Sequence, residues 1–210
     1  MRYASCHVRT SKMFQAKCAP RLMSNCAKKK IHVVKLIRLN IDSVAALLTS
    51  MSNATFIYQV RDPRGVIASR IKNKVLLTYP LEKEVQTMCS NMYYDAKVVQ
   101  ELSTKFPGRV HLLRYEDLTM TPATELQRIY DAIGETVPET VLKAFKSEDS
   151  EERFTTFQEK QGSFNTNREN PREVAVAWKE DLDEQVLGLV THQCKEFLEM
   201  MRYDRRRLDI

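Results

Sequence analysis

The residues best suited to chemistry lie in one short segment, where an arginine ends an apolar run and a serine follows eight positions later. The arginine is Arg61 and the serine is Ser69. Asp62 is a good helix N-cap and Pro63 fits a first helical position, so we expect a strand that runs directly into a helix ending near Lys72. A guanidinium at such a junction can hold a phosphate in a bidentate fork, and a hydroxyl about two helical turns further on adds a donor. The pattern indicates a phosphate site; a helix cap beside a solvated arginine is the alternative.

Three short apolar runs supply the elements that would position this segment. The runs 31–39, 55–60 and 110–115 are rich in β-branched residues and bounded by polar ones, which is typical of buried strands. Asp42 is expected to cap a helix after the first run, and Thr121 a helix after the third. This alternation predicts an α/β fold with a parallel sheet covered by helices on both faces. Ligands of such sheets bind at the carboxyl ends of the strands.

A long amphipathic helix is predicted between the second and third strands. Its apolar residues recur at spacings of three and four from Val85 to Leu102, and we interpret its Met and Tyr side chains as core packing. The Pro-Gly pair at 107–108 ends it. A short helix near 141–145 and a helical tail over about 172–201 are expected further on.

Composition limits the classes of protein. The 210 residues carry 33 Lys and Arg against 27 Asp and Glu, a net charge of +6, with 43% hydrophobic residues. These values predict one globular domain and exclude a disordered chain. Acidic and basic residues are interspersed, which favours a solvated surface over nucleic-acid binding. No apolar run reaches the roughly 18 residues of a membrane span, and no signal peptide is recognised.

Cysteine spacing bears on metal and redox chemistry. The five cysteines are Cys6, Cys18, Cys26, Cys89 and Cys194. None forms a CxxC pair and no His stands at metal-ligand spacing, so we expect no zinc site, no thioredoxin chemistry and no metal. Disulfide bonds and idle thiols stay equally open.

Two carboxylates, Glu116 and Asp117, follow the third predicted strand, where a general base would lie. A carboxylate at a strand end is more often a cap or a partner for an arginine, here Arg114, so we assign no catalytic residue. His111 lies within the predicted strand and is interpreted as structural.

The stretch from Phe56 to Arg70 closely resembles the 3′-phosphate-binding segment of the Golgi carbohydrate sulfotransferases, particularly those that sulfate O6 of galactose or N-acetylglucosamine. Other segments agree with that family in the same order: 34–39, 113–118, and a tail with Trp178, Cys194 and Tyr203. The resemblance covers roughly residues 30 to 203.

The resemblance implies a P-loop-NTPase-like, three-layer fold and sulfuryl transfer from 3′-phosphoadenosine 5′-phosphosulfate (PAPS) to a hydroxyl of a glycan acceptor. Arg61 and Ser69 match the two positions that contact the 3′-phosphate of PAPS. Arg64 belongs to the same segment and is a further candidate contact, with a charge facing the acceptor or plain solvation as other interpretations. Arg168 lies in a stretch like the family's mobile segment over the cofactor; an ordinary loop arginine is the alternative.

The family's 5′-phosphosulfate loop and its first strand are not recognised, because residues 1–30 contain no Gly to let backbone approach an anion. We therefore expect an irregular lead-in over 1–30, a partial sulfotransferase domain over 31–203 and a basic tail over 204–210. The chain is interpreted as part of an active enzyme, whose own activity stays open. The alternative is a non-catalytic remnant that binds adenosine 3′,5′-bisphosphate or glycan.

The compartment follows from the resemblance as well. It implies the Golgi lumen, with membrane attachment through an anchor that this chain does not show. Asn53, Ala54 and Thr55 form an acceptor sequence for N-glycosylation, although a predicted strand begins there. Cys194 matches a family cysteine, which makes a disulfide plausible without naming its partner.

Overall fold

The computed structural model describes residues 23–37, 39–74, 79–146 and 170–203, and the chain divides into two units, residues 1–39 and residues 40–210. Most of the expected lead-in, Arg168 and the basic tail 204–210 lie outside the described residues, as do Cys6 and Cys18.

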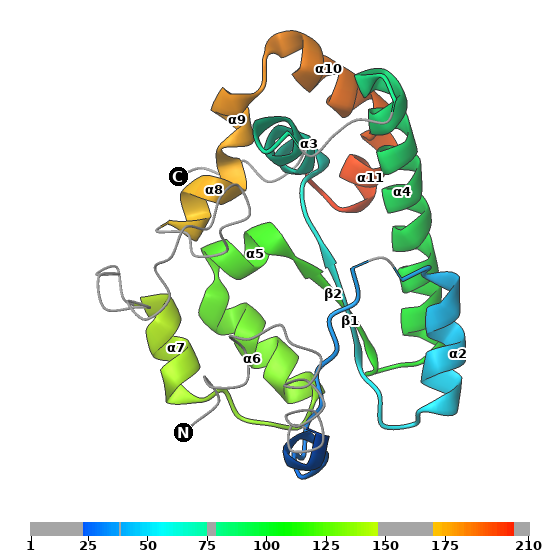
Figure 1. The fold of residues 1–210 in the computed structure, drawn as a ribbon, viewed down its shortest axis with the longest axis vertical. Coiled ribbons are helices and arrows are strands. Elements are labelled where there is room, and N and C mark those ends of the chain that lie inside the picture. The colour runs from blue at the N-terminus through cyan, green and yellow to red at the C-terminus, as the bar shows by residue number, and fades with distance from the viewer. Residues whose placement is uncertain (1–22, 38, 75–78, 147–169, 204–210) are drawn as a thin grey trace, which may run out of the picture. The chain divides into compact units, whose positions relative to one another are not determined.

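The larger unit alternates strands and helices (Figure 1). Its elements are α2 (Asp42–Ser50), β1 (Phe56–Val60), α3 (Pro63–Lys72), α4 (Leu81–Lys105), β2 (Val110–Arg114), α5 (Tyr115–Met120), α6 (Pro122–Ala132), α7 (Glu139–Lys146), α8 (Pro171–Val176), α9 (Trp178–Asp181), α10 (Glu184–Gln193) and α11 (Lys195–Met200). The predicted strands at 55–60 and 110–115, the helix after Pro63 and the long helix are confirmed.

The two strands pair in parallel, in a register that sets Phe56 opposite Val110 and Val60 opposite Arg114. A parallel pair confirms the α/β class. Because parallel strands point the same way, their carboxyl ends meet at one edge of the sheet, and α3 and α5 begin there (Figure 1). We call this edge, with the residues that directly follow β1 and β2, the carboxyl edge. The helical cover of both sheet faces in three layers stays a prediction.

The long helix α4 and the helical tail form the core with β1 and α3. The predicted apolar face of α4 is buried, with Met92 and Tyr93 packed at its margin, so the Met and Tyr stripe is core packing. Cys89 of α4 forms a disulfide with Cys194, which lies between α10 and α11. This bond joins positions 105 residues apart and ties the tail to α4.

Helix starts differ in detail from the predictions. Asp42 is the first residue of α2 rather than its cap, and the Asn40 side chain accepts the Asp42 N–H. Thr121 precedes α6 as predicted, but its hydroxyl donates back to the Asp117 carbonyl and caps no N–H. That bond closes α5, a short helix that the apolar pattern did not reveal because its six residues span fewer than two turns.

The prediction of a buried strand over residues 31–39 is wrong. Residues 31–37 form neither strand nor helix, and Val33, Val34 and Ile37 are 89%, 74% and 80% exposed. A β-branched run becomes a strand only where a neighbouring strand completes its backbone hydrogen bonds. Within the unit 1–39 no described residue belongs to a strand, so this run has no partner there.

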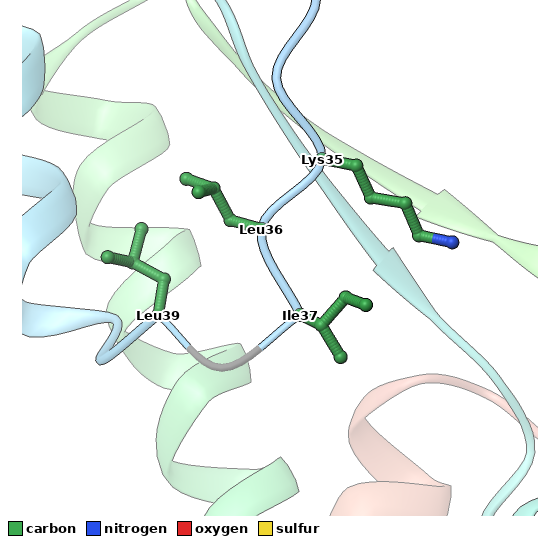
Figure 2. A pocket seen from close by; sticks show the side chains of 4 residues that line it. All are labelled: Lys35, Leu36, Ile37 and Leu39. Atoms are coloured by element: carbon green, nitrogen blue, oxygen red, sulfur yellow. The ribbon is translucent and has the colours of Figure 1, made fainter. Parts of the chain in front are cut away.

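The end of the same segment lines a pocket (Figure 2). The lining side chains are Lys35, Leu36, Ile37 and Leu39. Leu36 and Leu39 project to one side of the backbone, and Lys35 and Ile37 to the other. This lining offers one charged group and no convergent polar set, whereas a ligand pocket needs several polar groups that fix orientation.

The opposite edge of the sheet is held by Arg109, the residue before β2. Its Nε donates to the Ala54 carbonyl at 2.9 Å, and its Nη2 donates to the Leu48 carbonyl at 2.9 Å and to that of Met51. These bonds organise the connection between α2 and β1. Asn53 lies exposed in the turn of that connection, ahead of β1 rather than inside it.

Within the described residues, no helix is both long and apolar enough to cross a bilayer. The same residues contain no group of three or more His, Cys, Asp or Glu placed to hold a metal ion.

Candidate functional site

Arg61 follows β1 directly, and its side chain lies over the first turn of α3 at Gly65. A Cβ built at Gly65 would stand 3.1 Å from Arg61 Nε and 3.4 Å from its guanidinium carbon. Such a distance is tighter than ordinary carbon contact, so any larger residue would displace the arginine. Because Gly65 has no side chain, the Arg61 guanidinium can lie against the first turn of α3.

The Arg61 guanidinium has only part of its donors satisfied. Its Nη2 donates to the Val174 carbonyl at 2.9 Å, and the guanidinium carbon lies 4.9 Å from the centre of the Tyr115 ring. Nε is buried without a hydrogen-bond partner, and no carboxylate of the described residues forms an ion pair with Arg61. Leaving a buried donor unpaired costs about 1–3 kcal/mol. An uncompensated cation with a buried free donor is suited to an anionic ligand.

Ser69 lies on the face of α3 that Arg61 covers. It stands four residues after Gly65, and residues four apart share one helix face. Ser69 is half-buried, and its Oγ accepts from Asn73 Nδ2 at 3.3 Å. Because the oxygen is the acceptor in that bond, the hydroxyl hydrogen remains to donate to another group. The structure thus brings the two predicted phosphate contacts to one face of α3.

Arg64 is held inside the carboxyl edge. Its Nε and Nη2 donate to the two Asp62 carboxylate oxygens at 2.9 and 2.7 Å, and its guanidinium carbon lies 4.1 Å from the centre of the Trp178 ring. Asp62 also accepts the Arg64 backbone N–H at 2.9 Å, which confirms Asp62 as the N-cap of α3. The same carboxylate thus begins the helix and fixes Arg64 against the tail. Cofactor contact by Arg64 stays a prediction.

Glu116 is almost fully buried, at 1% exposure, and both of its oxygens are occupied. Oε1 accepts the Asp62 backbone N–H at 2.9 Å, and Oε2 accepts the Tyr203 hydroxyl at 2.9 Å. Burial raises the pKa of Glu116 above its ordinary value, while these hydrogen bonds act in the opposite direction. Burial and the Glu116 charge raise the pKa of Tyr203, which keeps its phenol protonated and able to donate.

Three other polar residues in or just after β2 interact with neighbouring groups, although Arg114 Nε is buried without a hydrogen-bond partner. Arg114 Nη1 lies 3.3 Å from the Asp117 carboxylate, and its guanidinium carbon lies 4.1 Å from the centre of the Tyr203 ring. The interpretation of a carboxylate partner for Arg114 is therefore confirmed for Asp117. His111 Nε2 lies 3.1 Å from the Gly108 carbonyl, in agreement with a structural role.

Sequence reasoning missed several parts of this site. Gly65 was inside the recognised segment, but its contact with Arg61 depends on how the side chain folds back. The Val174 carbonyl and the Tyr115 ring come from α8 and α5, and Tyr203 lies 87 residues after Glu116. No spacing rule connects positions so far apart in the chain. Arg168 lies outside the described residues.

The amino-acid sequence was compared with those of known proteins and protein families. A model of the sulfotransferase family matches residues 6–139. The chain is 26% identical over 198 residues to carbohydrate sulfotransferase 4 of Mus musculus, covering 85% of this chain and 50% of that protein. It is 21% identical over 196 residues to carbohydrate sulfotransferase 1 of Danio rerio, covering 85% of this chain and 46% of that protein.

The chain spans about half the length of the curated relatives it matches, and no solved structure matches it significantly. The family model covers more than half of the chain, and both relatives are carbohydrate sulfotransferases, so the resemblance seen in the sequence is confirmed. The chain belongs to the sulfotransferase family.

Proposed function

We propose that Arg61 and Ser69 bind the 3′-phosphate of PAPS. We further propose that the protein transfers sulfate from PAPS to a glycan hydroxyl. The observation that carries the proposal is the Arg61 guanidinium, which has a buried unpaired Nε and no acidic partner among the described residues. It lies against the face of α3 that bears Ser69. A phosphate bound at the guanidinium would neutralise the cation.

The residues present fit a nucleotide phosphate. Arg61 supplies the cation, and the Val174 carbonyl and Tyr115 ring orient its plane. Ser69 supplies a neutral donor on the same helix face, and Gly65 leaves room for the Arg61 guanidinium. PAPS supplies an already activated sulfuryl group, so the protein's contribution is to position the donor and stabilise charge. No general base is assigned.

The acceptor and the compartment belong to the same proposal. The relatives' names support a carbohydrate acceptor, and we propose O6 of galactose or N-acetylglucosamine on a glycosaminoglycan-type chain. We place the reaction in the Golgi lumen. The Cys89–Cys194 disulfide supports an oxidising compartment, and the exposed Asn53 acceptor sequence agrees with passage through the secretory route. The family's three-layer fold is proposed for the complete sheet.

Calorimetry with two nucleotides tests the phosphate site. Adenosine 3′,5′-bisphosphate carries the 3′-phosphate and adenosine 5′-monophosphate lacks it. We expect Arg61→Ala to lower the affinity for the bisphosphate by about 10- to 100-fold, as loss of a charge-assisted hydrogen bond implies, and to leave the monophosphate affinity unchanged. Lys72→Ala, an exposed cation on the same helix, is the control and should change neither. Equal affinity of the wild type for the two nucleotides would contradict the proposal.

Sulfate transfer is tested separately. Labelled PAPS is incubated with a keratan-type or N-acetylglucosamine-terminated acceptor, with Arg61→Ala as the inactive control. Transfer by the wild type alone supports the enzyme. Bisphosphate binding without transfer would instead support the alternative, a binding protein that retains the nucleotide site.

A further inference from the structure

We propose that Glu116 and Tyr203 are positioning residues for Arg61, so that the carboxyl-terminal tail sets the affinity of the 3′-phosphate site. The proposal rests on the proposed function of Arg61. It adds a role to two residues that lie away from the ligand and contact the site through the backbone of Asp62.

The strand register explains why Glu116 contacts that backbone. Val60 pairs with Arg114, so a continued ladder would set Asp62 opposite Glu116. However, β2 gives way to α5 at Tyr115, and the main chain of β2 no longer supplies an acceptor there. The Glu116 side chain replaces it and accepts the Asp62 N–H at 2.9 Å. The parallel pairing is thus extended by a carboxylate beyond the last residue of the strand.

This hydrogen bond fixes the peptide that joins Arg61 to Asp62. Pro63 has no N–H, so Asp62 is the last residue with a main-chain donor before the helix begins. Asp62 is fully buried, and a lost partner would leave its N–H unsatisfied. The direction of the Arg61 side chain depends on this peptide, because the backbone at residue 61 determines where its Cβ points.

Tyr203 holds Glu116 in the orientation that this bond requires. Its hydroxyl donates to Oε2 at 2.9 Å, and its ring is buried between the Arg114 guanidinium and Phe197, with ring centres 6.2 Å apart. Phe197 and Leu198 are fully buried in α11, and the Cys89–Cys194 disulfide anchors the start of that helix. Through Tyr203 and Glu116, the packing of the tail is therefore connected to the backbone that follows β1.

The contacts and the burial favour a structural role for Glu116 over that of a general base. A general base needs an oxygen that the acceptor hydroxyl can reach. Both Glu116 oxygens already accept hydrogen bonds, and the side chain has 1% exposure. Its contribution is to hold the Arg61 peptide in place.

The experiment measures the 3′-phosphate contribution, which is the ratio of affinities for adenosine 3′,5′-bisphosphate and adenosine 5′-monophosphate. Tyr203→Phe keeps the ring and removes only the hydroxyl. We expect this ratio to fall by roughly 3- to 10-fold, less than for loss of Arg61 itself, because the effect is indirect. Glu116→Gln retains an oxygen that can accept the Asp62 N–H, whereas Glu116→Leu retains none. The affinity ratio should therefore fall less in Glu116→Gln than in Glu116→Leu.

A matched control separates positioning from general loss of stability. Tyr58→Phe also removes a phenol that donates to a carboxylate, that of Asp95 at 3.3 Å, but on the face of the sheet against α4. We expect Tyr58→Phe to lower the melting temperature without changing the ratio. An equal fall of the ratio in both variants would overturn the proposal, because it would show a general effect of lost stability.

A double-mutant cycle separates this proposal from the proposed function. In an Arg61→Ala background, Tyr203→Phe should cause no further fall of the ratio, because Tyr203 acts through Arg61. If Arg61→Ala weakens bisphosphate binding but Tyr203→Phe and Glu116→Leu do not, only the positioning role is wrong. If Arg61→Ala itself has no effect on the ratio, both proposals fail.

Discussion

Arg61 and Arg109 lie at opposite ends of the same pair of strands, and their guanidinium groups are used in different ways. Arg109 donates to three main-chain carbonyls, one in the last turns of α2 and two in the connection between α2 and β1. Among the described residues, Arg61 donates to the Val174 carbonyl and its buried Nε has no hydrogen-bond partner. Both side chains are partly buried, so burial alone does not distinguish them.

The difference separates an arginine that organises the main chain from one that we propose binds a ligand. Carbonyl groups that close a loop need a rigid donor, and Arg109 meets that need completely. At the carboxyl edge, by contrast, Gly65 makes room, Glu116 fixes the adjoining peptide, and the cation is left without an anion among the described residues. The feature that we take to indicate a site is therefore the combination of an unmet buried donor with a cation that has no acidic partner among the described residues. Arg114 Nε and Trp178 Nε1 are also buried without a hydrogen-bond partner, but Arg114 forms an ion pair with Asp117 and the Trp178 ring carries no charge.

Removal of the disulfide should have the largest effect, and it should act on the carboxyl edge more than on the Arg109 edge. In Cys89→Ala combined with Cys194→Ala, we expect the free energy of unfolding to fall by about 4 kcal/mol, because the bond closes a loop of 105 residues. Urea unfolding measures the loss, and hydrogen exchange compares the two edges. Cys26→Ala, at an exposed free cysteine, is the control. Equal loss of protection at both edges would remove the distinction between them.

Exchanging the two arginines for methionine tests the comparison directly. Arg109→Met should lower the free energy of unfolding by about 2–3 kcal/mol, since three carbonyls lose a charged donor, and should leave bisphosphate affinity unchanged. Arg61→Met should do the reverse, with nearly unchanged stability and lost affinity. Thermal unfolding and calorimetry on the same samples measure both quantities. A loss of affinity in folded Arg109→Met would show that the two ends are coupled.

Gly65→Ala tests whether the position of the Arg61 guanidinium depends on the missing side chain of Gly65. The new Cβ would stand 3.1 Å from Arg61 Nε, so we expect a roughly 3-fold loss of bisphosphate affinity while stability stays equal or rises by up to about 1 kcal/mol through helix propensity. Gly188→Ala in α10 is the matched control, because a Cβ there meets no atom within 4 Å. It should gain stability without loss of affinity. Unchanged affinity in Gly65→Ala would show that the glycine is not needed by the arginine.

The smallest effect expected is a pH dependence that arises at Glu116 and not at the Arg109 edge. Because the pKa of Glu116 is raised in the folded protein, its carboxyl contributes stability below its unfolded pKa of about 4.3, and this contribution is lost as pH rises through the folded pKa. The free energy of unfolding of wild type relative to Glu116→Gln should therefore fall as pH rises through that window. Urea titrations at several pH values measure the difference. A rise with pH would contradict the sign.

Local patterns predicted the elements with strong signals of their own. The Asp-Pro pair after β1 predicted the cap and first residue of α3, and the spacing from Val85 to Leu102 predicted the buried face of α4. The run 31–39 carried an equally strong apolar signal and forms no strand, because a strand also depends on a partner that apolar periodicity does not specify. Resemblance of a motif predicted Arg61 and Ser69, and their role in binding stays a proposal.

The sequence by itself determined the α/β class, the junction between β1 and α3, and the family, since each can be read from local patterns and from the order in which they follow one another along the chain. The tertiary structure alone decided that Cys89 pairs with Cys194, that Arg61 lies on Gly65, and that Tyr203 reaches Glu116. Propensities and caps act over a few residues, whereas these contacts join segments that only packing brings together. The electrostatic character of Arg61 depends on what surrounds it after folding, which its position in the sequence does not express.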